Sequence, residues 1–341
     1  MTVSTGGKPR RFLITGGSGF IGTNLVEHYL KQSASVLNVD INPPRNAAHQ
    51  EHWLRKDICH RDDFIDAVKS WRPDVILHFA ARTDVKSDNV SDYSANTVGV
   101  SNVIEAAAQL DVRPTVVFAS SLLVCRLGYV PGHDTDYCPI NAYGQSKVEG
   151  ETRVRREAAG KFPWIIVRPT SIWGPWFGSP YYEFFGTVRR GWYVHPRGLS
   201  IERHYGFVLN TVSQIDALLG GEASHLTSKT VYLGDYEPIN VKVWANAIRS
   251  CYGMGPVREF PLAFFKLGAI LGDSLKTFGV DFPMTSYRLS NLLTMAQYDL
   301  SPMRRIAPTL KYGLDDAVKI TCEWLARART NPAVRQEALR T

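Results

Sequence analysis

The chain has 341 residues, which is long enough for one full-sized domain and a smaller second unit. Hydrophobic residues make up 44% and charged residues 21%, as in an ordinary globular protein, and the formal net charge is +7. This positive excess suits an anionic substrate, but the chain lacks the interleaved basic and aromatic residues of a nucleic-acid module.

The first half of the chain alternates short apolar runs with helical patterns, which predicts a parallel sheet wrapped by helices. The expected strands cover 11–15, 35–40, 74–80, 115–120 and 164–168, and the expected helices cover 20–31, 90–110 and 141–159. Two of these strands are nearly all apolar, as strands buried on both faces should be. We therefore predict an α/β fold with a Rossmann-type, doubly wound parallel sheet.

The amino-acid composition changes after Pro169, and the segment 173–196 is rich in proline, glycine and aromatic residues. These aromatic residues either fill a core between lobes or stack on a ligand. Shorter elements follow, with helices expected near 211–219, 241–251, 262–278 and 314–327 and a strand at 231–233. We expect one domain built on the sheet over residues 1–170 and a smaller, mixed α/β lobe over 171–341, interleaved with it.

Three glycines, Gly16, Gly19 and Gly22, lie where the first strand gives way to a helix. The first permits a tight turn, the second lets a pyrophosphate approach the backbone, and the third allows the helix to pack closely on the sheet. The N–H groups at the helix start, at Phe20 and Ile21, are expected to face phosphate oxygens. The pattern predicts a dinucleotide site, so residues 1–170 are expected to form a NAD-binding domain and 171–341 the substrate-binding lobe.

The second strand ends in Asp40, at the expected distance from the glycine turn. A carboxylate in that place accepts hydrogen bonds from an unmodified ribose and repels a 2′-phosphate, which favours NAD over NADP. Arg45 lies close by in sequence. It is interpreted either as a solvated loop arginine or as a cation that would tolerate NADP.

Tyr143 and Lys147 lie four residues apart in a predicted helix, so they share one face about a turn from each other. A phenol near a fixed ammonium has its anion stabilised, so we expect the pKa of Tyr143 to fall from roughly 10 toward working pH. Tyr143 is therefore predicted to move a proton on and off a carbinol oxygen. The bound dinucleotide would take the hydride.

With these motifs in place, the chain resembles the extended short-chain dehydrogenase/reductase superfamily, and especially its NAD-dependent nucleotide-sugar epimerase/dehydratase branch. The resemblance rests on Thr-Gly-x-x-Gly-x-x-Gly at 15–22, Asp57-Ile58, His78-Phe-Ala-Ala81, Asn96, Ser120-Ser121, Tyr143-x-x-x-Lys147 and Arg168-Pro169. It implies that Asp57 and Ile58 border the adenine of the cofactor. It also implies that Ala80, Ala81 and Arg82 line the middle of the cofactor, and that Asn96 contacts it.

The same resemblance implies that Ser121 hydrogen-bonds the reacting oxygen and that Lys147 also holds the nicotinamide ribose. Two residues have structural interpretations as well. His78, on a buried strand, is more typical of a satisfied core histidine than of a catalytic group. Asn96, near the head of a helix, could be a cap.

On the substrate side, the resemblance implies a diphosphate contact by Arg203, with Arg288 as a second candidate. The family's arginine stretch departs here at His204 and Asn210, where aspartates are common. Ser171 stands where the family often has asparagine, so a usual substrate contact is expected to be altered.

The residues directly after Ser121 predict the reaction. Dehydratases of this branch place a glutamate there, whereas this chain has Leu122 and Leu123, which cannot act as acid or base. We therefore predict a NAD-dependent C4 epimerase of a nucleoside diphosphate sugar, which re-reduces a keto intermediate from its other face. One alternative is a NAD(P)-dependent keto-sugar reductase or a dehydrogenase of a sterol-like secondary alcohol. Another is a non-catalytic dinucleotide-binding regulator.

Five scattered cysteines without a Cys-x-x-Cys pair predict neither a disulfide framework nor a metal site. The polar first ten residues suggest no secretory signal, and the longest apolar stretch, 262–271, is too short to span a bilayer. We expect a cytoplasmic protein with no nucleic-acid or membrane partner. The resemblance implies a homodimer through the helices 90–110 and 141–159.

Overall fold

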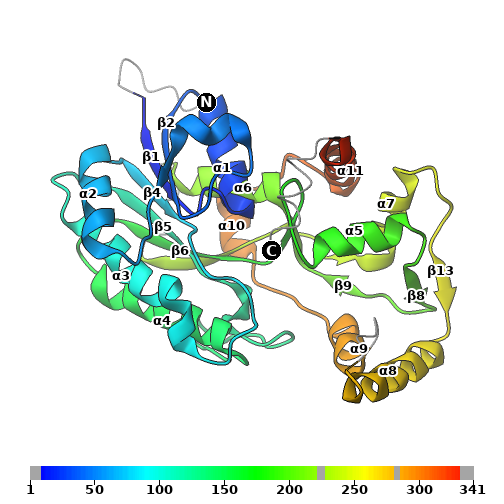
Figure 1. Cartoon of the computed structure of the whole chain (residues 1–341). Coiled ribbons are helices and arrows are strands. Elements are labelled where there is room, and N and C mark those ends of the chain that lie inside the picture. Colours follow the sequence, from blue (N-terminus) through cyan, green and yellow to red (C-terminus); the bar gives the residue numbers. More distant parts are fainter. Residues whose placement is uncertain (1–8, 221–226, 280–284, 331–341) are drawn as a thin grey trace.

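The computed structural model describes residues 9–220, 227–279 and 285–330 of the chain (Figure 1). Residues 1–8, on which the expectation of a cytoplasmic location partly rests, lie outside that description. The described chain forms two lobes, one built on a large sheet and the other on helices and short strand pairs (Figure 1).

A seven-stranded parallel sheet is the framework of the larger lobe, with the strand order β11-β6-β5-β4-β1-β2-β3. Its strands are β1 (Arg11–Thr15), β2 (Ser35–Asp40), β3 (Trp53–Arg55), β4 (Val75–His78), β5 (Thr115–Ala119), β6 (Trp164–Pro169) and β11 (Lys229–Leu233). The chain builds β1 to β3 toward one edge and then crosses to β4 on the other side of β1. Open α/β sheets bind ligands beyond the carboxyl ends of the strands at such a crossover. The predicted Rossmann-type fold is confirmed.

Helices cover both faces of this sheet (Figure 1). One face carries α1 (Phe20–Lys31), α6 (Val208–Leu218) and α10 (Ser301–Ile306), and the other carries α2 (Arg61–Trp71), α3 (Ser94–Ala108) and α4 (Ala142–Glu157). Side chains of a strand alternate between the two faces. In β1, Phe12 and Ile14 join the apolar cluster beneath α1, whereas Leu13 joins the cluster beneath α2 to α4.

The second lobe packs three helices together, α5 (Tyr181–Arg189), α7 (Val241–Ser250) and α11 (Leu314–Thr330). Three strand pairs accompany them: β7 (Ser171–Trp173) with β10 (Tyr205–Phe207), β9 (Glu202–Arg203) with β12 (Ile239–Asn240), and β8 (Val194–Pro196) with β13 (Arg258–Phe260). A helical hairpin of α8 (Leu262–Thr277) and α9 (Ser286–Leu293) extends from this lobe at one corner of the molecule (Figure 1).

The aromatic segment after residue 173 mostly builds the core of the second lobe. Trp173, Phe177 and Phe185 are at most 1% exposed and pack with Trp244 of α7. The core interpretation therefore holds for these side chains. Trp192 is the exception at 71% exposure.

The chain does not pass once from the first lobe to the second. After β7 to β10 it returns to the large sheet, where α6 packs on α1 and β11 pairs with β6. It then re-enters the second lobe at β12. The residues after 170 thus contribute both to the sheet that holds the dinucleotide motif and to the lobe opposite.

Candidate active site

The glycine turn between β1 and α1 is a cradle that side chains would fill. Gly16 has a φ of +72°, and a Cβ there would lie 2.5 Å from the backbone nitrogen of Ala80, two residues after the end of β4. A Cβ at Gly22 would lie 2.0 Å from the carbonyl oxygen of Gly16. Helix α1 therefore begins in direct contact with the turn, and its N-cap residue, Gly19, brings no capping side chain. The first-turn N–H groups at Phe20 and Ile21 are thus placed to bind an anion.

Asp40 at the end of β2 is half-buried beside this turn. Its carboxylate oxygens accept hydrogen bonds from the backbone N–H of Ser18, at 3.1 Å, and of Asn42, at 2.9 Å. Burial raises the pKa of Asp40, and these backbone hydrogen bonds lower it. The carboxylate is therefore joined directly to the glycine turn by the hydrogen bond from Ser18.

Arg45 has a structural task that the sequence did not reveal. Its Nε donates to the carbonyl oxygen of Ser18, at 3.1 Å, and its Nη1 donates to that of Trp176, at 2.7 Å. The guanidinium thus joins the glycine turn to the second lobe. The solvated-loop interpretation of Arg45 is wrong, because Nε and Nη1 both donate to backbone carbonyl oxygens.

The next stretch of the predicted cofactor site, Asp57 and Ile58, lies along the same edge of the sheet. Ile58 follows β3 and is 4% exposed, and its carbonyl oxygen accepts a hydrogen bond from Asn102 of α3. Asp57 accepts from the backbone N–H of Cys59, at 2.8 Å. Because β3 pairs with β2, the two residues follow the strand next to the one that ends in Asp40. Their contacts with an adenine stay a prediction.

Asn96 links the segment after β4 to α4. Its amide accepts from the backbone N–H of Arg82, at 3.0 Å, and donates to the carbonyl oxygen of the same residue, at 2.9 Å. It also donates to Ser146, whose hydroxyl donates in turn to the carbonyl oxygen of Tyr143. The cap interpretation of Asn96 is wrong, because the N-cap of α3 is Tyr93. Asn96 instead fixes the 80–82 segment, including Ala81, against the helix that carries Tyr143.

The three predicted catalytic groups come together beyond the carboxyl end of β5. Ser121 follows β5, and its hydroxyl interacts with the phenol of Tyr143 on α4. Lys147, one turn further along α4, donates from Nζ to the carbonyl oxygen of Ala119, at 3.0 Å. The structure thus places Ser121, Tyr143 and Lys147 at one edge of the sheet, close to the crossover that the glycine turn occupies.

The pKa of Tyr143 differs from the sequence-based expectation. Burial raises the pKa of this phenol, and the interaction with Ser121 lowers it. The expected fall in its pKa is wrong for this structure, because Lys147 is drawn to the strand carbonyl and desolvation of the phenol dominates. Burial also lowers the pKa of Lys147 to about 8, against the opposing effect of the Glu151 carboxylate.

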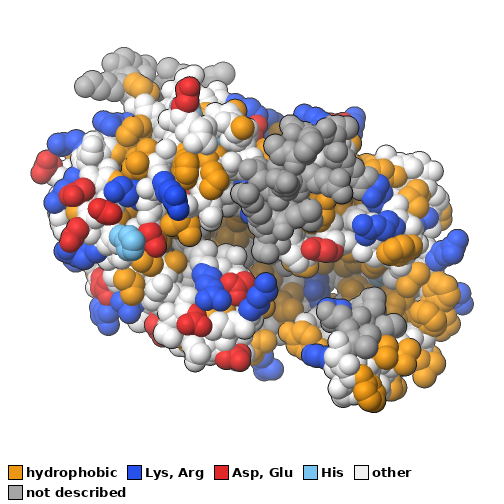
Figure 2. Space-filling view, viewed as in Figure 1, with side chains coloured by type: hydrophobic (Ala, Val, Ile, Leu, Met, Phe, Trp, Pro, Cys, Tyr) orange, Lys and Arg blue, Asp and Glu red, His pale blue; other side chains and the backbone are white. Residues whose placement is uncertain are grey.

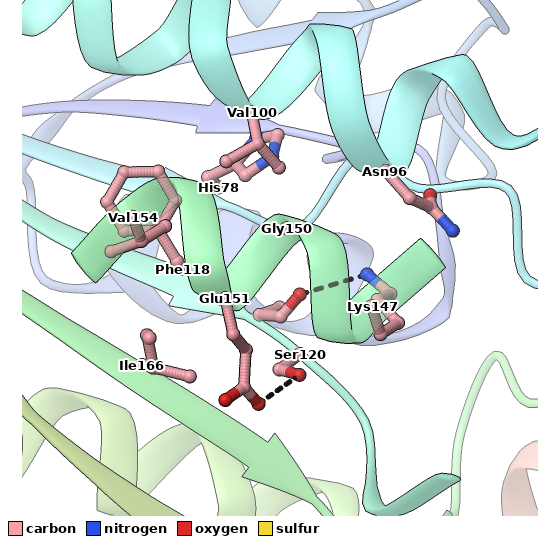
Figure 3. Close-up of a pocket in the computed structure, with 11 residues that line it drawn as sticks. His78, Asn96, Val100, Phe118, Ser120, Lys147, Gly150, Glu151, Val154 and Ile166 are labelled. Atoms are coloured by element: carbon pink, nitrogen blue, oxygen red, sulfur yellow. Dashed lines mark hydrogen bonds between the residues drawn. The ribbon is translucent and has the colours of Figure 1, made fainter. Parts of the chain in front are cut away.

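Glu151 organises the far side of α4 (Figure 3). Its carboxylate accepts from Nε and Nη2 of Arg168, each at 2.8 Å, from Ser120, at 2.6 Å, and from Tyr137, at 2.8 Å. Glu151 and Arg168 are each 1% exposed in their side chains. This buried pair ties α4 to β6 and to the end of β5, so it fixes the helix that carries Tyr143.

A cavity of about 20 Å³ lies behind Lys147, between α3, α4 and the strands (Figure 3). Such a space holds about one water molecule and is far too small for a dinucleotide. His78 lines it and pairs through Nδ1 with the hydroxyl of Thr15, at 2.8 Å. Burial, with the Lys147 charge, lowers the pKa of His78 to about 3, so the ring is a neutral, satisfied core group.

On the opposite side of the site, the second lobe presents a cluster of phenols around one arginine. Tyr181 interacts with Ser171, and Tyr205 interacts with Arg203. Arg203 donates from Nε to the carbonyl oxygen of Thr294, at 3.1 Å. Its Nη2 is buried and has no hydrogen-bond partner among the described residues.

The departures at His204 and Asn210 serve the fold. His204 accepts at Nδ1 from the backbone N–H of Tyr298, at 3.0 Å, and burial lowers the pKa of this ring. Asn210 donates to Asp235, at 2.9 Å, and exchanges two hydrogen bonds with the backbone of Tyr312. An aspartate at position 210 would face the carboxylate of Asp235, so the amide is the compatible residue.

Arg288 lies apart from this cluster in the chain, on α9. Its backbone N–H is capped by the hydroxyl of Thr285, and its side chain is exposed. Its role as a second diphosphate contact stays a prediction.

Sequence reasoning missed several residues of the site. Glu151 stands four residues after Lys147 and eight after Tyr143, so helical spacing could have placed it on the same face. The residues Tyr181, Tyr205 and Tyr298 come from separate short elements, and only the tertiary fold brings them to Arg203. Within the described ranges, no group of three or more His, Cys, Asp or Glu side chains is placed to hold a metal.

Taken together, the sheet crossover, the glycine cradle, Asp40 and the Ser121–Tyr143–Lys147 group define a dinucleotide-dependent enzyme of the Rossmann class. Residues 12–187 match the profile of the NAD dependent epimerase/dehydratase family. The chain belongs to this family, its cofactor is NAD, and the cradle and carboxylate described above fit that cofactor.

Relatives with assigned names include epimerases and dehydrogenases. The chain is 28% identical to UDP-glucose 4-epimerase of Vibrio cholerae over 54% of this chain and 58% of that protein. It is 26% identical to N-acetyl-alpha-D-glucosaminyl-diphospho-ditrans,octacis-undecaprenol 4-epimerase of Escherichia coli O157:H7, over 89% and 92%. It is also 26% identical to human sterol-4-alpha-carboxylate 3-dehydrogenase, decarboxylating, over 64% and 62%. A non-catalytic regulator is therefore not supported, since these relatives are enzymes.

Among solved structures, UDP-glucose 4-epimerase of Thermotoga maritima has the same fold. Its TM-score is 0.71 at 18% identity, over 94% of this chain and 99% of that one.

Proposed function

We propose that this chain is a NAD-dependent epimerase that inverts C4 of a nucleoside diphosphate sugar. The observation that carries the proposal is the convergence of Ser121, Tyr143 and Lys147, with two leucines and no carboxylate directly after the serine. The epimerase names of two relatives support this choice.

Each residue of this group has a role that its place determines. Tyr143 takes the proton from the sugar hydroxyl and later returns it, while Ser121 holds the reacting oxygen by a hydrogen bond. Lys147 would hold a ribose hydroxyl of bound NAD, and the side-chain hydrogen bond with Ser121 is the contact that lowers the pKa of Tyr143 and so favours its phenolate form. Bound NAD supplies the acceptor that takes up the hydride and gives it back.

The apolar residues after Ser121 bear on the choice of reaction. Leu122 is 8% exposed, and Ser121 caps this turn by accepting at its hydroxyl from the backbone N–H of Leu123, at 3.1 Å. Neither leucine can remove or supply a proton, so elimination lacks its acid and base. An epimerase requires only Tyr143, because the keto sugar turns over and is reduced from its other face.

The test is conversion of UDP-, GDP-, CDP- and dTDP-hexoses, followed by proton NMR of the C4 epimers. We expect one epimer pair to interconvert without net consumption of NAD. Tyr143→Phe should lower the rate by about 10²- to 10⁴-fold, because the proton acceptor is lost. Tyr287→Phe, at an exposed tyrosine on α9, is the matched control and should keep the full rate.

A secondary-alcohol dehydrogenase is the second candidate, favoured by the sterol dehydrogenase among the relatives. This activity would change NADH stoichiometrically with product, so absorbance at the nicotinamide band separates it from epimerisation. No conversion of any hexose, together with NADH formation from a sterol or another alcohol, would replace the epimerase proposal.

We further propose a cytoplasmic homodimer that pairs through α3 and α4. Exposed positions on these helices include Val98, at 45% exposure, and Gln145. Sedimentation velocity of the whole chain tests the dimer.

A further inference from the structure

Helix α8 has an apolar face on each of its two sides. The inner face, with Phe265, Ala269 and Gly272, is buried and packs toward Leu289 of α9. This contact already supplies the burial that an amphipathic helix of a soluble lobe requires. The opposite side of α8 would be expected to carry polar residues.

That opposite side carries large apolar residues instead. We call the outer face of α8 the set of five exposed side chains Phe264, 56%, Leu267, 68%, Ile270, 62%, Leu271, 53%, and Phe278, 81%. Leu267 lies three residues after Phe264, and Ile270 and Leu271 follow three and four residues later, so these four share the side of the helix opposite the buried one. Phe278, the C-cap residue of α8, follows seven residues after Leu271. Figure 2 shows hydrophobic side chains gathered at the corner where α8 lies. Contiguous apolar surfaces of this kind mark contact sites.

The shape of this surface favours a bilayer over a second protein. A helix of 16 residues is roughly 24 Å long and about 10 Å wide, so one face offers roughly 240 Å². A standard protein interface buries about 800 Å² on each partner. Helix α8 also lies at a corner of the molecule (Figure 1), where one side of it can meet a lipid surface.

The charges of the hairpin match an anionic surface. Lys266 and Lys276 of α8 are exposed. The carboxylate of α8, Asp273, accepts a hydrogen bond from the backbone N–H of Ser286 at the start of α9, at 3.1 Å. Lys276 lies on the side of α8 near this carboxylate, whereas Lys266, four residues before Ile270, flanks the outer face and is exposed toward lipid phosphates.

The hairpin is also joined to the substrate side of the active site. Helix α9 ends at Leu293, and the next carbonyl oxygen, of Thr294, accepts from Arg203. Ala296 forms a backbone bridge with Arg203 as well. A surface that holds α8 therefore lies one helix away from the arginine expected to bind a diphosphate.

We propose that the outer face of α8 docks on an anionic lipid bilayer, with its phenylalanine, leucine and isoleucine side chains at the acyl boundary. Across the described ranges, no helix is long and apolar enough to cross a membrane, so the contact is with the surface. This inference departs from the expectation of no membrane partner, which considered spanning segments alone. It does not depend on the proposed reaction.

The experiment is co-sedimentation of the full chain with vesicles of phosphatidylcholine and phosphatidylglycerol, 3:1, and with pure phosphatidylcholine vesicles. We expect binding to the mixed vesicles that weakens in high salt. The triple variant Leu267→Gln, Ile270→Gln, Leu271→Gln should bind at least about tenfold more weakly, because three apolar side chains no longer enter the lipid. Lys266→Glu should weaken binding to the mixed vesicles only.

A matched triple variant controls for the general loss of apolar surface. Val112→Gln, Trp192→Gln and Val243→Gln replace three exposed residues elsewhere, at 47%, 71% and 52% exposure, and should sediment like the wild type. Unchanged NAD binding verifies that each variant is folded. The proposal is overturned if the wild type does not sediment, if both triple variants lose binding equally, or if the α8 variant alters only the oligomeric state.

Discussion

The ammonium of Lys147 is held in an environment that disfavours its charge. Its side chain is 6% exposed, with the Ala119 carbonyl as its hydrogen-bond acceptor and Glu151 as the charge that favours the protonated form. Burial nonetheless lowers the pKa from 10.5 to about 8. A desolvated charge of this kind is typical of catalytic groups, where the folded state is less stable but the group is more reactive.

Replacing this lysine should therefore stabilise the protein. At pH 7 we expect Lys147→Met to raise the free energy of unfolding by roughly 1 to 2 kcal/mol, because the desolvated charge is removed at the loss of one hydrogen bond. The folded-state pKa lies below the unfolded value, so wild-type stability rises with pH between about 8 and 10.5. The gain in unfolding free energy of Lys147→Met over the wild type is therefore largest below pH 8 and becomes smaller above it.

Urea unfolding at pH 7 and pH 9.5 measures this difference. Lys276→Met, at an exposed lysine, should change stability little at either pH. A Lys147→Met protein that is less stable than the wild type at pH 7 would show that the ammonium is better solvated than this structure indicates.

Asp40 is expected to set the choice of cofactor. Its carboxylate is positioned by two backbone N–H groups, and a 2′-phosphate beside it would meet a like charge. We expect Asp40→Asn to weaken NAD binding by about 10- to 100-fold, the worth of a hydrogen bond to a charged group, and to improve NADP binding. Calorimetric titration of both cofactors at pH 8 tests this, with the exposed Asp62→Asn as control. An unchanged NAD/NADP ratio would contradict it.

At the scale of elements, α4 is the part that organises the site. It carries Tyr143, Lys147 and Glu151 at intervals of four residues, and Glu151 joins it to β6 through Arg168. The proton-transfer group and the buried ion pair therefore share one rigid helix. Loss of the pair should loosen the position of the phenol as well as the fold.

Breaking this pair should be costly, whereas replacing it whole should not. We expect Glu151→Gln to lower the free energy of unfolding by about 3 to 5 kcal/mol, because Arg168 is left buried without a counter-charge. The double variant Glu151→Leu, Arg168→Met should recover much of that loss. Glu237→Gln, which breaks an exposed pair with Arg304, should cost less than about 1 kcal/mol.

Chemical unfolding curves of these variants give the comparison. Equal losses for the buried and the exposed pair would mean that water reaches Glu151. A double variant as unstable as Glu151→Gln would mean that the polar contacts of Ser120 and Tyr137 matter more than the charge of Arg168.

The elements predicted best from the sequence are those with long apolar patterns. Six of the seven strands of the central sheet, and the helices that follow the glycine turn and carry Tyr143, agree with the structure to within a few residues. The seventh strand, β3, had no matching prediction, since a three-residue strand has no measurable periodicity, and α2 was also not predicted. The strand pairs of the second lobe join distant segments, and their register is set only by tertiary packing.

The site shows the same division. Local motifs located Asp40, Ser121, Tyr143 and Lys147, because each follows a strand or lies on a helix face that the pattern fixes. The pKa of Tyr143 depends on burial and on where the Lys147 ammonium points, and neither can be derived from spacing. The pair of Glu151 and Arg168 was not predicted either, because these residues are 17 positions apart in the sequence and only the packing of α4 on β6 brings them together.

At the scale of the whole molecule, substrate binding is expected to join the two lobes. Tyr143 belongs to the sheet lobe, whereas Arg203 lies on β9 of the second lobe. The segment that bridges to Arg203 at Ala296 also places Tyr298 against Tyr232 of β11, with ring centroids 5.1 Å apart, so the two lobes approach each other there. A sugar held at Tyr143 could thus extend its diphosphate toward Arg203.

This arrangement predicts that Arg203 governs substrate affinity and not cofactor affinity. Arg203→Lys keeps a charge but loses the planar pair of donors, one of which, Nη2, has no partner among the described residues. We expect KM for the sugar substrate and Kd for UDP, used as a diphosphate probe, to rise about 10- to 100-fold. kcat should change by only a few-fold, and NAD binding should not change. Arg258→Lys, at an exposed arginine of β13, should match the wild type, and an unaltered Kd for UDP in Arg203→Lys would place the diphosphate elsewhere.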